Sequence, residues 1–363
     1  MDKHYLTPLF LPEIIAVFAG QAEDPASQTA HAKALREALR AQRYSGTLHF
    51  LDIHTSGTLG DLAQTRADLA IIALPPQDVA AALELAGRMA CRSALVLGSG
   101  MGSDKAAELK KIARREGVSL LGPNSLGFQL PHLQLNASAA GPLAKAGSLA
   151  LVSQSGALTS SMLDWASKNA VGFSAVISVG RHTSVDIAEV LDYLANDART
   201  QSIIVYLEGI SSARRFMSAL RSAATAKPVV VLKAGRKPAG NAAAQTHSGA
   251  IVGSDEVFDA ALRRAGAVRV RSFVALFSAA KCLASRYRPV GRRLAIVTNG
   301  GGPGVLAADW VNEIGLQLGQ LSPESAGTLQ PLLPELASLT GLIDLSEEAG
   351  RKVARSLRIV TID

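Results

Sequence analysis

Short apolar runs alternate with longer amphipathic stretches along the chain. Ile14–Phe18 is an apolar run that ends near Gly20, and the stretch Gln28–Arg43 after it has apolar residues spaced by three and four. The first pattern predicts a buried strand and the second predicts a helix. Further buried strands are predicted at 69–74, 94–97 and 118–121, each followed by a turn of Gly, Pro, Ser or Asn. Strands that alternate with helices indicate a parallel, doubly wound sheet.

The same pattern restarts twice after a segment at 136–147 that is rich in Ala, Gly, Pro and Ser and reads as a linker. The first restart has a strand at 148–153, a helix at 157–167, and strands at 175–179, 202–207 and 228–232. The second follows Pro289, with a strand at 294–298, a glycine-rich turn at 299–304 and a helix at 305–314. We therefore expect three α/β domains, at 1–145, 146–287 and 290–363.

The two restarts resemble each other in sequence. Leu149–Gly156 lines up with Leu294–Gly301, and in the same register Trp165 meets Trp310, each preceded by Asp. Any two strand–turn–helix units share a general pattern, but these are the only tryptophans in the chain, so their match favours an internal duplication. Two such domains would present two helix N-termini to one site.

Composition narrows the class of protein. The 363 residues are 48% hydrophobic and only 4% aromatic, which is typical of a globular α/β protein rather than a disordered chain. No apolar run reaches 18 residues and the N-terminus lacks a signal-peptide core, so neither a membrane span nor secretion is expected. The two cysteines, Cys91 and Cys282, are far apart and outside any His or Cys cluster, so we expect no disulfide, no metal site and a cytoplasmic location.

The formal net charge of +7 suits a polyanionic small ligand such as a nucleotide or coenzyme A, but it also suits nucleic acid or a plain solvated surface. The basic residues are scattered over predicted helices with few aromatic residues between them. The chain has no zinc finger, RNP motif or basic arm. Nucleic acid is therefore the disfavoured partner.

Two predicted turns have the composition of anion sites. A helix that begins after a Gly- or Ser-rich turn leaves backbone N–H groups free to hold a phosphate. Ser155–Ala157 and Gly300–Gly302 both fit, although glycines after a parallel strand often serve only the tight turn. The first turn of the chain, at Gly20 and Gln21, has no G-x-G-x-x-G, and no Walker A pattern occurs, so neither an NAD-type site nor a P-loop is indicated.

A histidine in a small-residue loop is the candidate nucleophile. A lone histidine more often has a structural role than a catalytic one. His247, however, stands within Thr246–Ala250 and outside any apolar run, which weakens the interpretation as a core residue. A nucleophilic imidazole needs one ring nitrogen free and the other held by an acceptor. Glu208 follows the apolar strand 202–207 and would lie at its carboxyl end, where it could orient that imidazole.

Together these motifs resemble those of the NDP-forming acyl-CoA synthetases and the succinyl-CoA synthetase α subunit. Thr246–Ala250 looks like the phosphohistidine loop of this family, and Tyr206–Ile210 looks like the segment whose glutamate steadies the histidine. Val152–Ala157 and Thr298–Gly304 are similar to the two phosphate-binding helix starts, and Leu121–Gly127 is similar to the last loop of the CoA-binding domain. The resemblance covers nearly the whole chain.

This resemblance implies a Rossmann-like CoA-binding domain followed by flavodoxin-like, succinyl-CoA synthetase-like doubly wound domains. It implies an acid–thiol ligase in which His247 carries the phosphoryl group and Glu208 assists it. The helix starts at 155–157 and 300–302 would bind phosphate. Coenzyme A would bind at Gly20, Gln21, Pro75, Ser99 and Asn124. The nucleotide and its Mg²⁺ would bind to an ATP-grasp partner in a larger assembly.

The chain departs from the family pattern in three places. Ala19–Asp24 lacks the usual Gly-Ala-Ser and places Glu23 and Asp24 where a phosphate would approach. No ATP-grasp domain is recognisable. Only 19 residues follow Asp344, so we expect the third domain to be cut short.

Two other functions remain open at the level of sequence. The same architecture resembles the N-terminal part of some protein lysine acetyltransferases, which suggests a non-catalytic module that senses CoA or acyl-CoA. A plain nucleotide-binding α/β protein without phosphoryl transfer is the third reading. The presence of His247 favours the catalytic one.

Overall fold

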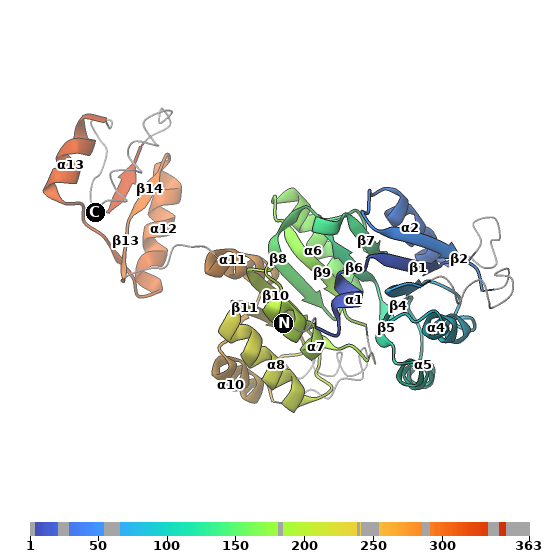
Figure 1. Ribbon diagram of the computed structural model, residues 1–363. Helices are drawn as coiled ribbons and strands as arrows, with labels where there is room; N and C mark the ends of the chain where they lie inside the picture. Colours follow the sequence, from blue (N-terminus) through green and yellow to red (C-terminus); the bar gives the residue numbers. More distant parts are fainter. Residues whose placement is uncertain are drawn as a thin grey trace. The chain divides into compact units, whose positions relative to one another are not determined.

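The computed structural model describes residues 4–20, 29–53, 66–180, 184–237, 240, 254–284, 291–332 and 341–345. The chain divides into two compact units, Met1–Ser285 and Arg286–Asp363 (Figure 1). The first unit contains two β-sheets, and the second contains two short strand pairs. The α/β class expected from the alternating pattern is confirmed.

The first sheet has five parallel strands in the order β2-β1-β3-β4-β5. The strands are β1 (Ile14–Phe18), β2 (Thr47–Leu51), β3 (Leu69–Ile72), β4 (Ser93–Leu97) and β5 (Ser119–Ser125). Helix α2 (Ala30–Arg40) covers one face, and α4 (Val79–Arg88) and α5 (Ser103–Glu116) cover the other. Because both faces are covered, the inner strands β3 and β4 are buried along their whole length and apolar except for Ser93.

The second sheet has seven strands in the order β12-β11-β10-β8-β9-β6-β7. Its parallel part consists of β8 (Ala146–Ser153), β9 (Phe173–Ser178), β10 (Ser202–Leu207), β11 (Val229–Lys233) and β12 (Val268–Val270). Helices α6 (Gly156–Lys168) and α11 (Phe273–Ala284) cover one face. Helices α7 (Ile187–Asn196), α8 (Ala213–Ala226) and α10 (Asp255–Ala265) cover the other.

A hairpin that the sequence pattern did not predict completes this sheet. Strands β6 (Gly127–Leu130) and β7 (Leu135–Ser138) pair antiparallel with each other, and β6 pairs antiparallel with β9. The interpretation of 136–147 as a linker is therefore wrong at both ends, because residues 136–138 belong to β7 and residues 146–147 belong to β8. The buried side-chain amide of Asn136 donates a hydrogen bond to Gly141 O at 2.9 Å. A polar side chain on β7 thus satisfies a backbone carbonyl group of the loop that follows.

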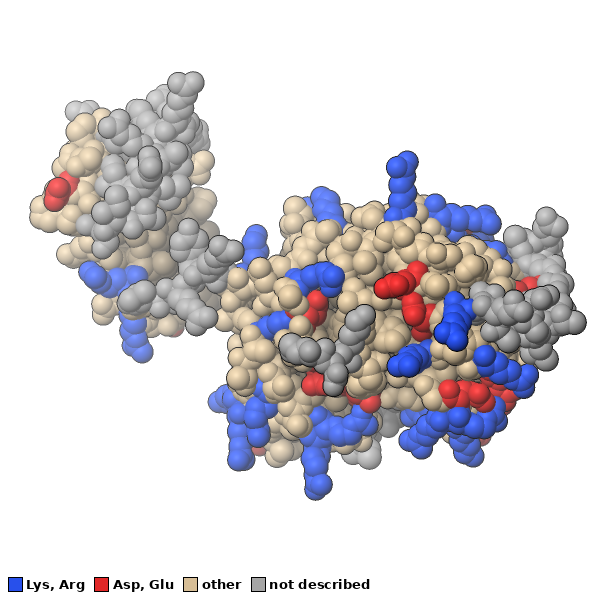
Figure 2. Space-filling view, in the orientation of Figure 1, with Lys and Arg blue, Asp and Glu red and all other residues tan. Residues whose placement is uncertain are grey.

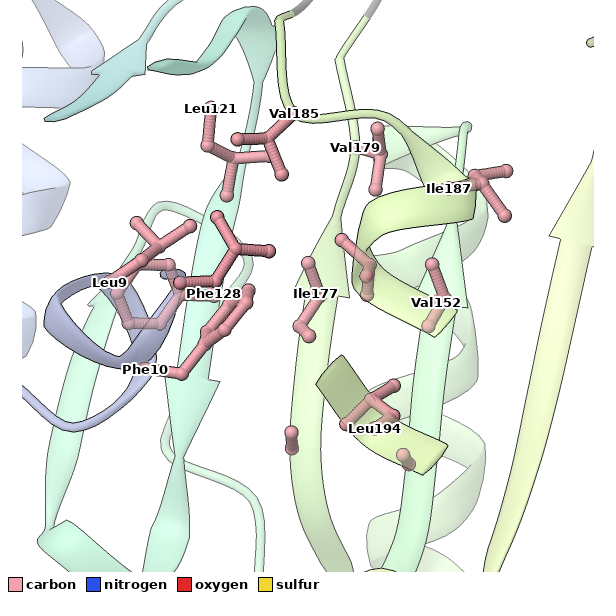
Figure 3. Packing of buried hydrophobic residues seen from close by; sticks show 14 of the residues in the cluster. Leu9, Phe10, Leu121, Phe128, Val152, Ile177, Val179, Val185, Ile187 and Leu194 are labelled. Atoms are coloured by element: carbon pink, nitrogen blue, oxygen red, sulfur yellow. The ribbon is translucent and has the colours of Figure 1, made fainter. Parts of the chain in front are cut away.

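A short N-terminal helix joins the two sheets of the first unit. In α1 (Thr7–Phe10) the ring of Phe10 lies 5.7 Å from that of Phe128 on β6 and 4.8 Å from that of Tyr193 on α7, between ring centroids. Figure 3 shows Leu9 and Phe10 packed beside Phe128, with Leu121 of the first sheet beside Val185. One continuous apolar core thus runs from α2 through both sheets to α8.

The second unit is small. Strand β13 (Arg293–Leu294) pairs in parallel with β15 (Gln317–Leu318), and β14 (Ile296–Thr298) pairs in parallel with β16 (Leu342–Asp344). Helix α12 (Gly301–Glu313) is followed by α13 (Pro323–Leu329) and the 3₁₀ turn Gln330–Leu332. We expected one strand over 294–298 and a helix from Val305. The helix starts four residues earlier because Pro303 falls in its first turn, where a proline is tolerated.

Basic side chains are scattered over the face of the first unit that is in view (Figure 2). Figure 2 shows Lys and Arg side chains spread over several parts of the visible face of the first unit, with acidic side chains between them. None of the helices in the described ranges is both long and apolar enough to span a bilayer.

Candidate active site

The strand order of the second sheet reverses between β8 and β10. The chain passes from β8 to β9 on one side and then crosses to β10 on the other, so these two neighbouring strands form a topological switch point. Ligands of doubly wound sheets bind beyond the carboxyl ends of the strands at such a point. Gln154 and Ser155 follow β8, and Glu208 and Gly209 follow β10.

The amide of Gln154 ties the ends of these two strands together. Its Oε1 accepts hydrogen bonds from the backbone N–H groups of Glu208 at 2.7 Å and Gly209 at 3.1 Å, and its Nε2 donates to Gly209 O at 2.9 Å. The backbone N–H of Gln154 donates to Tyr206 O at 3.2 Å. The sequence analysis missed this residue, although its place between Ser153 and Ser155 in the turn after β8 was a signal. Gln154 fixes the backbone from which the Glu208 side chain projects.

Ser155 caps the helix that starts at the switch point. Its Oγ accepts from the backbone N–H of Leu158 at 3.4 Å, and its carbonyl oxygen accepts from Ser153 Oγ at 3.0 Å. Gly156 begins α6, and a Cβ there would lie 2.8 Å from Leu126 Cγ, so any larger residue would force the Leu126 side chain to move. Ser155 and Gly156 are half-buried and Ala157 is exposed. The positive end of α6 therefore lies at the switch point and suits an anion.

Glu208 is buried at the end of β10, with 7% of its surface exposed. Burial and the adjacent carboxylate of Glu208 raise the pKa of Tyr206 to about 12. Tyr206 therefore stays a neutral hydrogen-bond donor at physiological pH, next to the acid. His247 lies outside the described residues, so its contacts with Glu208 remain a prediction.

A shallow depression borders Gln154 on the side of α7 and α8. It is polar because Asp186 and two serines open onto it. Asp186 caps α7, accepting from Ala188 N at 2.9 Å and from Ser211 Oγ at 3.1 Å. The depression is lined by Gln154, Asp186, Ile187, Ala188, Gly209, Ile210, Ser211, Ser212 and Phe216.

The candidate CoA residues lie at the carboxyl edge of the first sheet. Gly20, with φ +68°, follows β1, and Pro75 follows the neighbouring strand β3. Ser99 is exposed after β4, and Asn124 lies in the next strand, β5. The amide of Asn124 donates to Met101 O at 2.8 Å and accepts from Met101 N at 3.0 Å, so it fastens the β4 loop to β5.

The structure thus places Gly20, Pro75, Ser99 and Asn124 at the carboxyl ends of four neighbouring strands, β1, β3, β4 and β5. Gln21 lies outside the described residues. Within those ranges, no group of three or more His, Cys, Asp or Glu side chains is arranged to hold a metal ion.

The second unit repeats the turn of the first. Thr298 Oγ1 donates to Gly300 O at 2.9 Å, and Gly300 N donates to Thr298 Oγ1 at 3.2 Å. Ser153 and Ser155 make the same two contacts, at 3.0 and 3.1 Å. Helices α6 and α12 are each 13 residues long and begin directly after Ser155 and Gly300. This geometry supports the internal duplication inferred from sequence.

The N-terminus of α12 begins with glycines, which contribute no side chains of their own. Gly300 is half-buried, whereas Gly301 and Gly302 are exposed. Gly300 has no side chain with which to cap the helix, so any acceptor for its first N–H groups comes from elsewhere. Asp344 ends the neighbouring strand β16, and a Cβ on Gly301 would lie 3.1 Å from Asp344 Oδ2.

Comparison with known proteins identifies similar chains. Residues 146–283 match the family model of the succinyl-CoA ligase-like flavodoxin domain. The chain is 35% identical to acetate–CoA ligase (ADP-forming) I of Archaeoglobus fulgidus, over 98% of this chain and 53% of that protein. It is 34% identical to the α subunit of acetate–CoA ligase (ADP-forming) II of Pyrococcus furiosus, over 82% of this chain and 66% of that protein.

A solved structure shares the fold over nearly the whole chain. Acetyl-coenzyme A synthetase 1 of Ca. Korarchaeum cryptofilum, in complex with phosphate and ADP, superimposes with a TM-score of 0.84 at 28% identity. The match covers 94% of this chain and 76% of that one. The chain spans between about half and two thirds of the length of the two ligases described above.

Proposed function

Because the chain belongs to the family of NDP-forming acyl-CoA synthetases, we propose that it is the CoA-binding, phosphohistidine-carrying part of such an enzyme. The observation that carries this proposal is the switch point of the second sheet. There the side chain of Gln154 fixes the backbone of the buried acid Glu208. The next residue, Ser155, caps α6. A carboxylate and a helix N-terminus are the groups that a histidine-bound phosphoryl group requires, one for the imidazole and one for the phosphate.

The proposed reaction has three steps. Phosphate displaces CoA from the acyl-CoA, so a C–O bond forms, a C–S bond breaks, and acyl phosphate and CoA result. A ring nitrogen of neutral His247 then attacks phosphorus in line, and the carboxylic acid leaves as its anion. The phosphohistidine finally passes its phosphoryl group to a nucleoside diphosphate. Glu208 orients the ring and stabilises its positive charge, and the N-termini at Ser155 and Gly300 stabilise the phosphate.

Three parts share this work in the proposal. Residues 1–145 hold CoA at Gly20, Gln21, Pro75, Ser99 and Asn124. Residues 146–287 carry His247, and residues 290–363 contribute the second helix start. A partner of the ATP-grasp type binds the nucleotide with Mg²⁺, which neutralises phosphate charge there. The assembly is oligomeric and cytoplasmic.

Labelling of the purified chain tests the proposal. The first two steps of the proposed reaction do not involve a nucleotide or its partner protein. Incubation of the chain with acetyl-CoA and [³²P]phosphate is therefore expected to leave an acid-labile, base-stable label on the protein. Calorimetry with CoA is expected to show binding. Binding of CoA without any label would favour the non-catalytic sensing module, and absence of both would favour a plain nucleotide-binding protein.

Glu208→Gln is expected to lower the rate of labelling by about a hundredfold, because the amide retains the shape of the acid but cannot stabilise a charged imidazole. The affinity for CoA, measured by calorimetry, should not change. Glu108→Gln is the matched control, since Glu108 lies on α5 in an exposed ion pair with Lys105. A Glu208→Gln protein that labels at the original rate would remove this acid from the mechanism.

A further inference from the structure

The segment that carries His247 leaves the second sheet after β11 and rejoins the described fold at α10. Its two ends meet in an ion pair. Arg236, three residues after β11, has its Nε 3.6 Å from Oδ2 of Asp255, the first residue of α10. The Arg236 side chain is 29% exposed, and its Nε is buried without a hydrogen bond. The contact is therefore a charge pair across the base of the segment.

Asp255 is held from the other side by a buried arginine. Arg269 on β12 is 8% exposed and pairs through Nη2 with Asp255 Oδ1. Its Nη1 donates to Asp255 O at 3.2 Å and to Asp259 Oδ1 at 3.3 Å. The charge of Asp255 is thus compensated without Arg236. We therefore expect the packing of α10 against β12 to survive the loss of the outer arginine.

An aromatic ring completes the rigid half of this cluster. Phe258 of α10 lies beneath two cations, with Lys233 Nζ 5.7 Å and Arg269 Cζ 5.8 Å from its centroid. Lys233 is the last residue of β11, and its Nζ also donates to Ala234 O. Strand β11, strand β12 and the start of α10 are therefore locked together at one point. Arg236 extends these contacts three residues beyond β11, to the side chain of Asp255.

We propose that the Arg236–Asp255 pair is a clasp that fixes the stem of the His247 segment, which makes Arg236 a positioning residue for phosphoryl transfer. The inference rests on the proposed function of His247. A contact that closes the base of a segment reduces the number of conformations that its interior residues can adopt. Reacting groups misplaced by about 1 Å can lose about a hundredfold in rate, so the stem affects chemistry that it does not touch.

The test compares Arg236→Ala, Arg236→Lys and, as matched control, Arg263→Ala. Arg263 is 76% exposed on α10 and pairs with Asp259 rather than with Asp255. The rate of labelling from acetyl-CoA and [³²P]phosphate is measured at several phosphate concentrations, together with CoA affinity and thermal unfolding. Arg236→Ala is expected to slow labelling about tenfold at saturating phosphate. The phosphate concentration for half-saturation, the CoA affinity and the unfolding temperature should stay unchanged.

Arg236→Lys is expected to label at most of the original rate because it keeps the charge, and Arg263→Ala should label like the unaltered protein. Adding Arg236→Ala to an Asp255→Asn protein should cause no further loss, since the pair is already broken. Labelling of Arg236→Ala at the original rate would overturn the proposed clasp. A change only in the phosphate concentration for half-saturation would also overturn it, because it would indicate that Arg236 binds phosphate directly. Absence of label on the unaltered protein would remove the proposed function, and the positioning role with it.

Discussion

Replacing His247 by alanine is expected to abolish the acid-labile, base-stable label that acetyl-CoA and [³²P]phosphate leave on the protein. Alanine has no nucleophilic nitrogen, so the phosphoryl group of the acyl phosphate has no acceptor on this chain. The loss should reach the detection limit of the assay, because the change removes the bond-forming atom itself. The helix N-termini at Ser155 and Gly300 contribute only about 0.3–1 kcal/mol each when exposed and cannot replace it.

The control for this change is another histidine. His4 lies on the N-terminal segment, where its Nε2 is 3.1 Å from Asp192 Oδ2 and its ring packs on Tyr193. His4→Gln should label like the unaltered protein. Calorimetry with CoA and thermal unfolding of His247→Ala should match the original, because the proposed role is chemical. Equal labelling of His247→Ala would show that another residue carries the phosphoryl group.

Replacing Gln154 by alanine is expected to lower the free energy of unfolding by about 2–3 kcal/mol and to slow labelling at the same time. The N–H groups of Glu208 and Gly209 and the carbonyl of Gly209, all just after β10, would lose their side-chain partner. Each such group, when buried, costs about 1–3 kcal/mol, and water can reach part of this half-buried site. The backbone of Glu208 would also lose its anchor. Urea denaturation followed by circular dichroism measures the stability change.

Gln201→Ala is the matched control for Gln154→Ala, since Gln201 is exposed immediately before β10. It should change the free energy of unfolding by less than about 0.5 kcal/mol. Gln154→Glu separates the two effects. It keeps the acceptor for the Glu208 and Gly209 N–H groups, but it loses the donor to Gly209 O and adds a negative charge near Glu208. If Gln154→Ala were as stable as the original, the amide would not hold the strand ends together.

The sequence by itself determined the buried frame. Ile14–Phe18 and Ser202–Leu207 are strands at the residues predicted, because each is an unbroken apolar run bounded by turn residues and covered on both faces. The start of α6 was also readable to within one residue, since a Ser-Gly turn before a helix is a property of a few adjacent residues, whereas α12 begins at Gly301 and not at the predicted Val305. Local chemistry of this kind needs no distant partner.

Only the tertiary structure decided which strands are neighbours and which polar residues are buried. The half-exposed edge strand β2 and the hairpin β6–β7 carry no long apolar run, and Asn136 is buried only because Gly141 supplies an acceptor for its amide. The role of Gln154 depends on β8 and β10 lying side by side, although 53 residues separate it from Leu207 at the end of β10.

The same holds for the clasp. Arg236, Asp255 and Arg269 are scattered charges in the sequence, and nothing in their spacing distinguishes them from solvated surface residues. They meet because β11 and β12 are adjacent and α10 starts above them. Pairing of strands and burial of charge are set by the free energy of the whole packed unit, so residues distant in sequence acquire their partners only when the sheet has formed.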